Sequence, residues 1–352
     1  MLYEKAIVRE DMENIIERDY ISFNKLNNKT VLITGANGML AYYFTCVLMH
    51  LNIKKNFKIK VIALVRNLSK AESKFSSFLD DERFVLLHQD ICDEINLIEP
   101  VDYIVHAAGA ASPKFINNDP VGIIAANTKG TVNVLEFAKK NKVKNILFTS
   151  TREIYGKVEG IEFISEQDMG VIDPMESRSC YPESKRMAEQ LFKSYYNQYN
   201  IPFTIARIAH SYGPGMEIND DGRVMSDFIS DIVNNKNIIM KSTGMAERAF
   251  CYINDAVAAM FLILLDGKIG EAYNIANETE PMMIRDVALL LVDIFKEKSL
   301  SVTYELNNDQ NGYCKYARVG LDTNKIEMLG WKPMITLSEG MKRTVLSFEN
   351  LK

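Results

Sequence analysis

The sequence predicts an α/β fold in which a doubly wound parallel sheet carries a smaller, mixed C-terminal lobe. Two observations support this fold class. Short, fully apolar runs recur between residues 30 and 208, as expected of strands that are buried on both faces of a parallel sheet. Segments with helical periodicity lie between several of these runs, and strands that alternate with helices form right-handed βαβ units. The sheet should therefore be Rossmann-like and bind ligands at the carboxyl ends of its strands.

The elements of the sheet domain follow in chain order. Its predicted strands are the apolar runs at residues 31–33, 60–65, 84–87, 103–106, 145–148 and 203–208. Its predicted helices are the periodic segments at residues 39–51, 122–141 and 182–199. Residues 1–28 carry apolar side chains at helix-like intervals among charges, so we expect a helical extension that packs on the body or on a partner subunit. We assign the Rossmann domain to residues 29–208.

The alternation of strands and helices ends after residue 208. Residues 210–223 are rich in Gly, Pro, Asp and Asn, which marks loops. Helix-like segments follow at residues 224–234, 255–265 and 285–296, with short strand candidates near Ile238 and Tyr273. We expect residues 209–244 and 281–352 to form a substrate lobe over the carboxyl ends of the strands, and a segment near 245–280 to return to the Rossmann domain.

Composition argues against several classes of protein. Of the 352 residues, 47% are hydrophobic and 25% are charged, which is typical of a folded globular chain. The formal net charge of −5 gives no support to a nucleic-acid binder, which needs a basic surface. The longest apolar run is too short to cross a bilayer, the charged start does not resemble a signal peptide, and the five cysteines are dispersed. We therefore expect a cytoplasmic protein that binds no nucleic acid, no membrane and no metal.

A glycine-containing loop joins the first predicted strand to the first predicted helix. Gly35 and Gly38 would allow a tight turn and let backbone N–H groups and a helix N-terminus approach a pyrophosphate, and Ala41 is the third small position. Two such glycines also occur in ordinary turns. Their place between strand and helix favours the dinucleotide site, to which we assign both glycines together with Asn37 and Met39.

Tyr181 and Lys185 are four residues apart on the opening turn of a predicted helix, so they share one face. An ammonium beside a phenol stabilises the phenolate and lowers the pKa of the phenol, as a general base requires. Such a pair is also common on solvated helices. Thr151 ends another predicted strand, where its hydroxyl could hydrogen-bond a substrate oxygen or merely satisfy the backbone.

Together and in this order, these signals resemble the extended short-chain dehydrogenase/reductase superfamily, the NAD(P)-dependent nucleotide-sugar epimerases and dehydratases. The likeness spans about residues 29–348, and its motifs are residues 34–38, 90–91, 106–109, 127–128, 150–156 and 181–185. Within this group the chain looks most like the UDP-glucuronate decarboxylases (UDP-xylose synthases). That closer likeness lies in residues 111–113, 178–181, 222–224, 248–250, 318 and 328–331.

The resemblance implies a role for each matching residue. Tyr181 would be the base, with Lys185 as its pKa partner and ribose ligand. Thr151 would polarise the C4 oxygen of the sugar, and Glu153 would be a second acid or base. Further cofactor contacts would come from Asp90, Ile91, Ala107, Ala108, Gly109 and Asn127. Arg248 would hold the nucleotide diphosphate, and the other substrate candidates are Ser112, Arg223 and Arg318.

Two positions depart from the pattern of the family. Arg152 stands where the 4,6-dehydratases carry an Asp and the decarboxylases a Ser. Because an Arg cannot deliver a proton at neutral pH, water elimination is in doubt. The departure from the Ser of the decarboxylases also puts decarboxylation in doubt, although a guanidinium could pair with a substrate carboxylate. His210 replaces an Asn near the diphosphate. It could donate to a phosphate if protonated, but packing is the interpretation we favour.

The choice of cofactor depends on the end of the second predicted strand. Residues 63–67 contain no carboxylate that could accept the adenine ribose hydroxyls. Arg66, with Lys70 nearby, would suit a 2′-phosphate, so we lean toward NADP. Alternatively, Arg66 stacks on the adenine or faces water.

The predicted activity is transient oxidation of a nucleotide-diphosphate sugar at C4 to a 4-keto sugar. Decarboxylation of the UDP-glucuronate type is our first choice, and 4-epimerisation follows closely. A 4,6-dehydratase, or a net 4-keto reductase or dehydrogenase that releases its cofactor, uses the same Tyr181 and Lys185. A non-catalytic NAD(P)-binding protein is the least favoured alternative. The family also implies a homodimer, in which helices at residues 122–141 and 182–199 pair across a two-fold axis.

Overall fold

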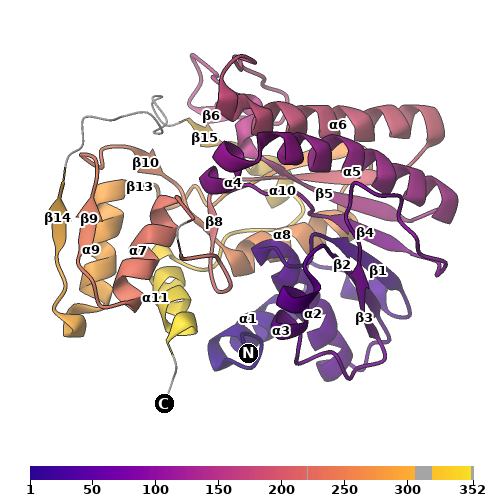
Figure 1. The fold of residues 1–352 in the computed structure, drawn as a ribbon, viewed down its shortest axis with the longest axis horizontal. Coiled ribbons are helices and arrows are strands. Elements are labelled where there is room, and N and C mark those ends of the chain that lie inside the picture. Colours follow the sequence, from indigo (N-terminus) through magenta and orange to yellow (C-terminus); the bar gives the residue numbers. More distant parts are fainter. Residues whose placement is uncertain (220, 306–318, 350–352) are drawn as a thin grey trace.

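The computed structural model describes residues 1–219, 221–305 and 319–349 (Figure 1). At its centre lies a seven-stranded sheet in the order β12-β7-β5-β4-β1-β2-β3, in which every neighbouring pair is parallel. The strands are β1 Thr30–Thr34, β2 Lys60–Val65, β3 Phe84–His88, β4 Tyr103–His106, β5 Asn145–Thr151, β7 Phe203–Ile208 and β12 Glu271–Ile275. The predicted doubly wound parallel sheet is therefore confirmed, and the strand candidate near Tyr273 is its edge strand β12.

The strand order reverses between β1 and β4. The chain passes from β1 outward to β2 and β3, and then returns to β4 on the other side of β1. At such a reversal the connections after the two strands run to opposite faces, which leaves a crevice at their carboxyl ends. The loops that follow β1 and β4 therefore lie where an open α/β sheet binds its ligand.

Helices cover both faces of the sheet (Figure 1). Successive β1 side chains alternate between the faces: Val31 and Ile33 join one hydrophobic core, and Leu32 joins the other. On one face lie α1 Ala6–Ile16, α2 Met39–Lys54 and α8 Ile253–Asp266. On the other lie α5 Pro120–Asn141 and α6 Cys180–Tyr199. All five helices had been expected, with ends shifted by a few residues; α5 begins earlier because the Asp119 side chain accepts the Gly122 N–H.

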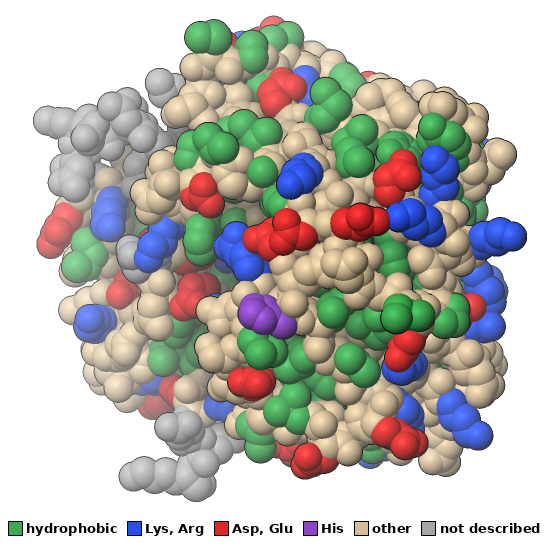
Figure 2. Space-filling model, turned by 45° about the vertical axis from the view of Figure 1, so that its right-hand side comes forward, with side chains coloured by type: hydrophobic (Ala, Val, Ile, Leu, Met, Phe, Trp, Pro, Cys, Tyr) green, Lys and Arg blue, Asp and Glu red, His purple; other side chains and the backbone are tan. Residues whose placement is uncertain are grey.

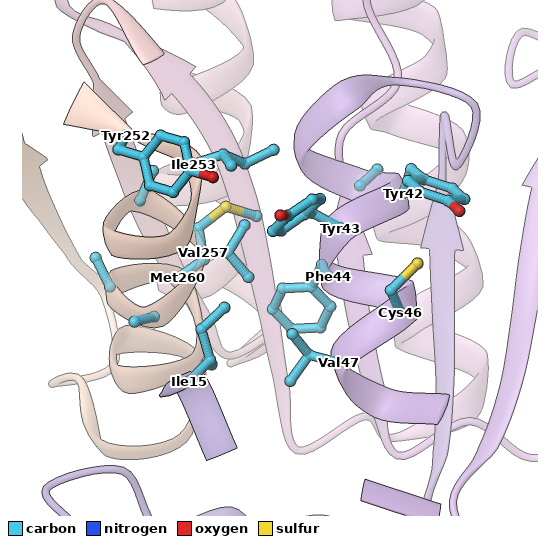
Figure 3. Packing of buried hydrophobic residues seen from close by; sticks show 14 of the residues in the cluster. Ile15, Tyr42, Tyr43, Phe44, Cys46, Val47, Tyr252, Ile253, Val257 and Met260 are labelled. Carbon is cyan, nitrogen blue, oxygen red and sulfur yellow. The ribbon is translucent and has the colours of Figure 1, made fainter. Parts of the chain in front are cut away.

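The packing between α2 and α8 explains why α2 is apolar on all sides. Figure 3 shows Phe44 and Val47 of α2 directed toward Val257 and Met260 of α8. Phe44 also stacks on Phe261, with ring centroids 3.7 Å apart. Because α2 contacts the sheet on one side and α1 and α8 on others, more than one of its faces is buried. A helix in that position needs apolar residues around its circumference.

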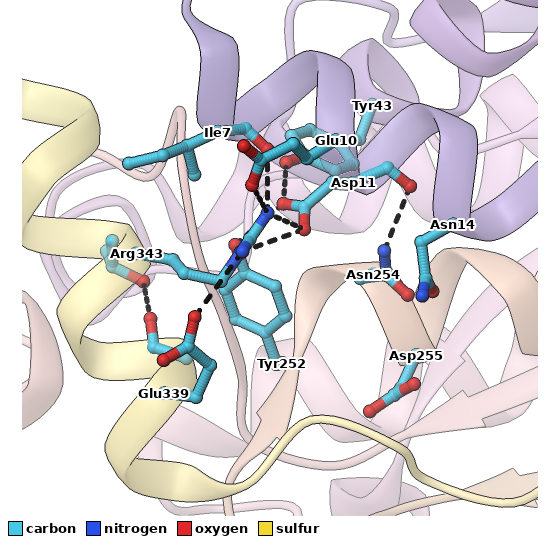
Figure 4. Close-up of polar contacts among 12 residues, drawn as sticks. Ile7, Glu10, Asp11, Asn14, Tyr43, Tyr252, Asn254, Asp255, Glu339 and Arg343 are labelled. Atoms are coloured by element: carbon cyan, nitrogen blue, oxygen red, sulfur yellow. Dashed lines mark hydrogen bonds and ion pairs between the residues drawn. The ribbon is translucent and has the colours of Figure 1, made fainter.

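The N-terminal helix α1 packs on the body of the protein, one of the two places expected for it. Val8, Met12 and Ile15 are fully buried in the core that α2 and α8 share. Its one buried acid, Asp11, hydrogen-bonds Tyr43 of α2 and Tyr252 just before α8 (Figure 4). The extension is thus fixed to the Rossmann domain by both apolar and polar contacts.

The smaller lobe consists of helices and two-stranded pairs. Its main helices are α7 Val224–Val233, α9 Ile284–Ile294 and α11 Leu337–Phe348. Its strand pairs are β9 Ile238–Met240 with β14 Val302–Tyr304, and β10 Glu247–Arg248 with β13 Met282–Met283. Two further pairs join it to the sheet domain: β8 Ser211–Tyr212 with β11 Cys251–Tyr252, and β6 Phe163–Ile164 with β15 Gly320–Leu321. The predicted domain boundaries themselves stay a prediction.

Several short elements were not predicted. They are α3 Leu68–Lys74, α4 Pro113–Asn118, α10 Asn324–Glu327, and the 3-10 helices at Phe23–Leu26, Arg152–Tyr155, Ser177–Ser179 and Lys296–Lys298. On the face that Figure 2 shows, acidic, basic and hydrophobic side chains are interspersed, in keeping with 41 basic and 46 acidic residues. Within the described ranges of the chain, no helix combines the length and the apolar character needed to span a membrane.

Candidate active site

The predicted site residues lie along one edge of the sheet. Neighbouring strands β1, β4, β5, β7 and β12 run in parallel, so their carboxyl ends meet at that edge. The glycine loop follows β1, residues 107–109 follow β4, and Thr151 is the last residue of β5. His210 and Glu278 come shortly after the ends of β7 and β12. A ligand that lies across the edge can thus contact all five strand ends, and it would run from the first crossover to the smaller lobe.

The glycine loop leads from β1 into α2, and Gly38 is the last residue before the helix. Gly35 has a φ of +65°, and a Cβ there would lie 2.7 Å from the carbonyl oxygen of Ala107 and from the backbone of Ala108. Only a glycine allows this approach between the two crossover loops. The loop and the N-terminus of α2, which begins at Met39, therefore fit the pyrophosphate of a dinucleotide.

Adding a methyl group at Gly35 should damage this cradle. For Gly35→Ala we expect a loss of about 1–3 kcal/mol of folding stability from the positive φ, and a strong loss of NAD affinity from the collision with Ala107 and Ala108. Calorimetric titration with NAD and urea unfolding measure the two effects. Gly160→Ala is the matched control, because Gly160 also has a positive φ of 78° but no atom lies within 4 Å of its Cβ position. Equal NAD affinity in both variants would contradict the assignment.

A second group of predicted cofactor residues gathers between β4 and α5. Gly109 has a φ of +143°, and a Cβ there would lie 2.6 Å from Oδ1 of Asn127 and 3.6 Å from Nζ of Lys185. Asn127 is fully buried, and its Nδ2 donates to the Ser184 hydroxyl at 2.9 Å. Its Oδ1 has no hydrogen-bond partner among the described residues, so a buried acceptor faces the place where Gly109 and Lys185 meet.

The remaining cofactor candidates lie at the ends of β2 and β3. Arg66 is exposed, and its Nη1 lies 3.9 Å from a carboxylate oxygen of Asp90. The other Asp90 oxygen accepts the backbone N–H of Cys92 at 2.8 Å, which turns the chain after β3. Ile91 is buried in the core against α5. Asn37 donates to the Asn67 carbonyl at 3.0 Å and so links the glycine loop to the loop after β2.

The structure brings Tyr181, Lys185 and Thr151 together between α6 and the end of β5. All three side chains are buried. The Thr151 hydroxyl lies near enough to the Tyr181 phenol to lower the pKa of that phenol, and it accepts the Glu153 backbone N–H at 3.2 Å. Nζ of Lys185 donates to the Thr149 carbonyl at 2.9 Å. The phenol, the hydroxyl and the ammonium named in the sequence argument therefore form one cluster.

Burial dominates the electrostatics of this cluster. It raises the pKa of Tyr181 above its ordinary value, and the nearby Glu153 carboxylate raises it further. The Thr151 hydroxyl and the positive charges of Arg178 and Arg223 lower the pKa of Tyr181. The lysine four residues away predicts a lowered pKa for the phenol. In the structure the pKa is raised instead, because desolvation outweighs the neighbouring cations.

Arg178 was not predicted as a site residue. Its Nη2 donates to Oε1 of Glu153 at 2.6 Å, and its charge acts on Tyr181. Glu153 and Arg178 come from two different 3-10 helices, one after β5 and one before α6. Arg223, which forms an ion pair with Asp221 at the start of α7, approaches the phenol from the smaller lobe. The sequence signal for Arg178 was only its place beside the tyrosine motif.

A small pocket unites three of the predicted substrate residues. Arg152, His210 and Arg248 line it, together with Ala209, Ala249, Glu278 and Val319. Nη2 of Arg152 donates to the Val319 carbonyl at 3.2 Å. Two guanidinium groups and an imidazole on one pocket suit an anionic ligand. Glu278 was missed, since one acid after an edge strand carries no recognisable signal; it accepts the Leu321 N–H at 2.9 Å.

The other candidates are placed as follows. Ser112 is buried and precedes α4. The ring of His210 lies 5.9 Å from that of Phe250, so the residue both packs and lines the pocket. Arg318 lies outside the described residues. In the part of the chain that the structure covers, no group of three or more His, Cys, Asp or Glu side chains could hold a metal ion.

Comparisons with known proteins agree with the sequence resemblance. UDP-glucuronic acid decarboxylase 5 of Arabidopsis thaliana is 34% identical over 316 residues, which cover 90% of this chain and 88% of that protein. UDP-glucuronic acid decarboxylase 1 of Xenopus tropicalis is 28% identical over 355 residues, which cover 97% and 79%.

Solved structures of the same fold include two epimerases. The UDP-glucose 4-epimerase of Thermotoga maritima, with UDP-glucose, has a TM-score of 0.76 and 23% identity, and the match covers 91% of this chain and 98% of that one. The UDP-glucuronic acid 4-epimerase of Bacillus cereus, in complex with UDP-glucuronic acid and NAD, has a TM-score of 0.75, 23% identity and the same coverage. Residues 31–276 match the NAD dependent epimerase/dehydratase family. The chain therefore belongs to the NAD-dependent epimerase/dehydratase family of enzymes, and UDP-glucuronic acid decarboxylases are its relatives over nine tenths of its length.

Proposed function

We propose that this enzyme decarboxylates UDP-glucuronic acid through transient oxidation of the sugar at C4. The observation that carries the proposal is the buried cluster in which the Tyr181 phenol lies near the Thr151 hydroxyl, one helical turn from Lys185. The relatives named UDP-glucuronic acid decarboxylase support this choice of substrate. The proposal places the nucleotide diphosphate on the smaller lobe, near Arg248.

The residues present fit a nicotinamide dinucleotide. The glycine loop would hold its pyrophosphate, and the unpartnered Asn127 Oδ1 and the Lys185 ammonium would face the ribose beside the nicotinamide. When bound, NAD supplies an acceptor for the C4 hydride and later a donor that returns it. Every other requirement of the reaction falls on side chains of this protein.

Tyr181 would remove the proton from the C4 hydroxyl while Thr151 hydrogen-bonds the same oxygen. Because burial raises the pKa of the free phenol, the phenolate needs positive charge nearby. Arg178 and Arg223 supply part of it, and the Lys185 ammonium lies on the same face of α6. Glu153, held by Arg178, would serve as the second acid or base near the sugar.

The 4-ketone makes the C6 carboxylate a β-keto acid. The C5–C6 bond can then break, with its electron pair entering the enolate at C4 and C5, and a proton must be added at C5 to complete the loss of CO₂. Arg152 lines the pocket with Arg248 and could pair with the carboxylate before that step.

One observation favours 4-epimerisation as a second candidate. Arg152 stands where the resembling decarboxylases have a Ser, and a guanidinium that pairs with the carboxylate could retain it. The ketone would then be reduced from its other face, and UDP-galacturonic acid would form with no change of mass.

Incubation of the purified protein with UDP-, dTDP-, GDP- and CDP-sugars, followed by mass spectrometry, tests the proposal. We expect UDP-glucuronic acid to lose the mass of CO₂. An unchanged mass with a new NMR pattern would indicate the epimerase, and loss of water a 4,6-dehydratase. A product whose mass falls by two hydrogens, with one reduced cofactor released, would indicate a net dehydrogenase. No change of any sugar would overturn the proposal.

The proposal also covers the cofactor preference, the oligomeric state, the location and the domain division of the protein. The exposed Arg66 at the end of β2, with Lys70 nearby, favours NADP over NAD, and parallel calorimetric titrations with the two cofactors decide this point.

A homodimer is supported by exposed apolar side chains of α5 and α6, namely Val121, Ile124 and Met187. Sedimentation measures that state. We also propose a cytoplasmic location and the division into an N-terminal extension, a Rossmann domain and a substrate lobe.

A further inference from the structure

A buried ion pair lies directly behind the catalytic cluster. Glu189 of α6 is one turn beyond Lys185, and Arg207 belongs to β7. Nη2 of Arg207 donates to Oε2 of Glu189 at 2.6 Å, and Nε lies 3.2 Å from both carboxylate oxygens. Only 7% of the Arg207 side chain and 11% of the Glu189 side chain are exposed. Removing two charges from water is costly, so the pair calls for a role beyond stability.

Glu189 and Lys185 each hydrogen-bond a residue near the end of β5, and these two strand residues are adjacent in the sequence. The Ser150 hydroxyl donates to Oε1 of Glu189, and the Lys185 ammonium donates to the Thr149 carbonyl at 2.9 Å. Two side chains one turn apart on α6 thus fix two adjacent residues of the strand. The next residue is Thr151, whose hydroxyl contacts the Tyr181 phenol.

Arg207 extends the same network to the segment that carries Glu153. Its Nη1 donates to the Tyr155 hydroxyl at 3.0 Å and to the Glu166 carbonyl at 2.8 Å. Tyr155 lies in the 3-10 helix that contains Glu153, and its own hydroxyl donates to Asn274 of β12. One ion pair therefore connects the elements that carry Thr151, Glu153 and Lys185.

Among the groups that surround the Lys185 ammonium, Glu189 supplies the negative charge that stabilises it. Burial lowers the pKa of Lys185 to about 8, and the Glu189 carboxylate opposes that change. From β4, His106 faces the ammonium, but burial lowers the pKa of this imidazole to about 3, so it is neutral. From β5 come the Phe148 ring, 4.6 Å away, and the Thr149 carbonyl. From α5 comes the uncharged amide of Asn127.

We propose that Glu189, held in place by Arg207, is a positioning residue that keeps the Lys185 ammonium charged and fixed against the end of β5. Its catalytic consequence rests on the proposed function, because it acts through the lysine that stabilises the Tyr181 phenolate. Its physical consequence, the charge state of Lys185, can be measured without any substrate.

The test is an NMR titration of protein labelled at the lysine ε-carbons, in which Lys185→Arg identifies the Lys185 signal. We expect the pKa of Lys185 to be about one pH unit lower in Glu189→Gln than in the unchanged protein, because a nearby negative charge is removed. Glu183→Gln is the matched control, because Glu183 lies on the same helix, is 39% exposed and pairs with Arg186 at 3.6 Å. Arg207→Met removes the guanidinium that holds Glu189 but keeps the carboxylate, so it should lower the pKa of Lys185 less than Glu189→Gln does.

Activity gives a second readout. The ammonium is lost as pH rises through its pKa, so kcat of Glu189→Gln should fall about fivefold at about pH 8 and little at about pH 6.5. If Glu189→Gln does not fold, the double variant Glu189→Gln/Arg207→Met, which leaves no unpaired buried charge, takes its place with the same expected shift. An unshifted Lys185 pKa in these variants, or an equal shift in Glu183→Gln, would overturn the inference. Absence of sugar turnover in the unchanged protein would count against the proposed function alone.

Discussion

Replacing Tyr181 with phenylalanine is expected to lower kcat for the nucleotide sugar by about 10²–10⁴-fold, the usual contribution of a general acid–base group. The ring itself packs in a small apolar cluster with Ile116 and Ile123, and phenylalanine fills the same space. The substitution should therefore lower kcat without lowering the stability of the fold. NAD affinity, measured by calorimetry, should stay within about twofold, because only one hydroxyl is removed.

A control on the same helix separates the chemistry from a general effect of removing a phenol. The Tyr195 hydroxyl also makes a side-chain hydrogen bond, to Glu136 of α5 at 2.8 Å, but it lies far along α6 from the strand ends. Tyr195→Phe should leave kcat close to that of the unchanged protein. Full turnover by Tyr181→Phe would remove the phenol from the mechanism, and equal losses in both variants would point to a defect of the helix.

The second large effect concerns stability. Asp11→Ala is expected to lower the free energy of unfolding by about 3 kcal/mol, because it leaves buried groups without their partner. Tyr43 and Tyr252 donate to one oxygen of the Asp11 carboxylate, and Nε of Arg343 donates to the other at 3.1 Å (Figure 4). Only 15% of the Arg343 side chain is exposed, so its cation cannot be fully hydrated instead.

Glu10→Ala is the matched control for this prediction. Glu10 contacts the same guanidinium at 3.1 Å, but 64% of its side chain is exposed, so its removal should cost less than about 1 kcal/mol. Urea unfolding of both variants measures the difference. If Glu10→Ala is as destabilising as Asp11→Ala, the buried carboxylate is not what joins α1, the Rossmann domain and α11.

The central sheet could be predicted because strands buried on both faces leave a short, fully apolar signature. The position of α1 could not, since polar contacts that fix it join Asp11 to residues more than 230 positions away, namely Tyr252 and Arg343. The helix α3 escaped because only Ala71 of it is buried, so it has almost no apolar periodicity.

Some residues of the candidate site could also be predicted from the sequence, and others could not. Gly35 could be proposed for the site because it stands in a glycine loop between a strand and a helix, and Tyr181 and Lys185 because they are four residues apart on one helix. The pairs Glu153–Arg178 and Glu189–Arg207 join side chains that are 25 and 18 positions apart, and no spacing rule links them. The direction of the Tyr181 pKa shift was also beyond the sequence, because burial, its largest cause, is a property of the folded chain.

The most direct measurement uses UDP-glucuronic acid that carries deuterium at C4. If the sugar is oxidised at C4 and reduced again within one active site, the product loses the mass of CO₂ and keeps the deuterium. Tyr181→Phe, tested in parallel, should form this product about 10²–10⁴-fold more slowly. A product without deuterium would show that the cofactor does not return the same hydride, and it would contradict oxidation and reduction within one active site. An unchanged substrate would contradict the assignment of this site to UDP-glucuronic acid.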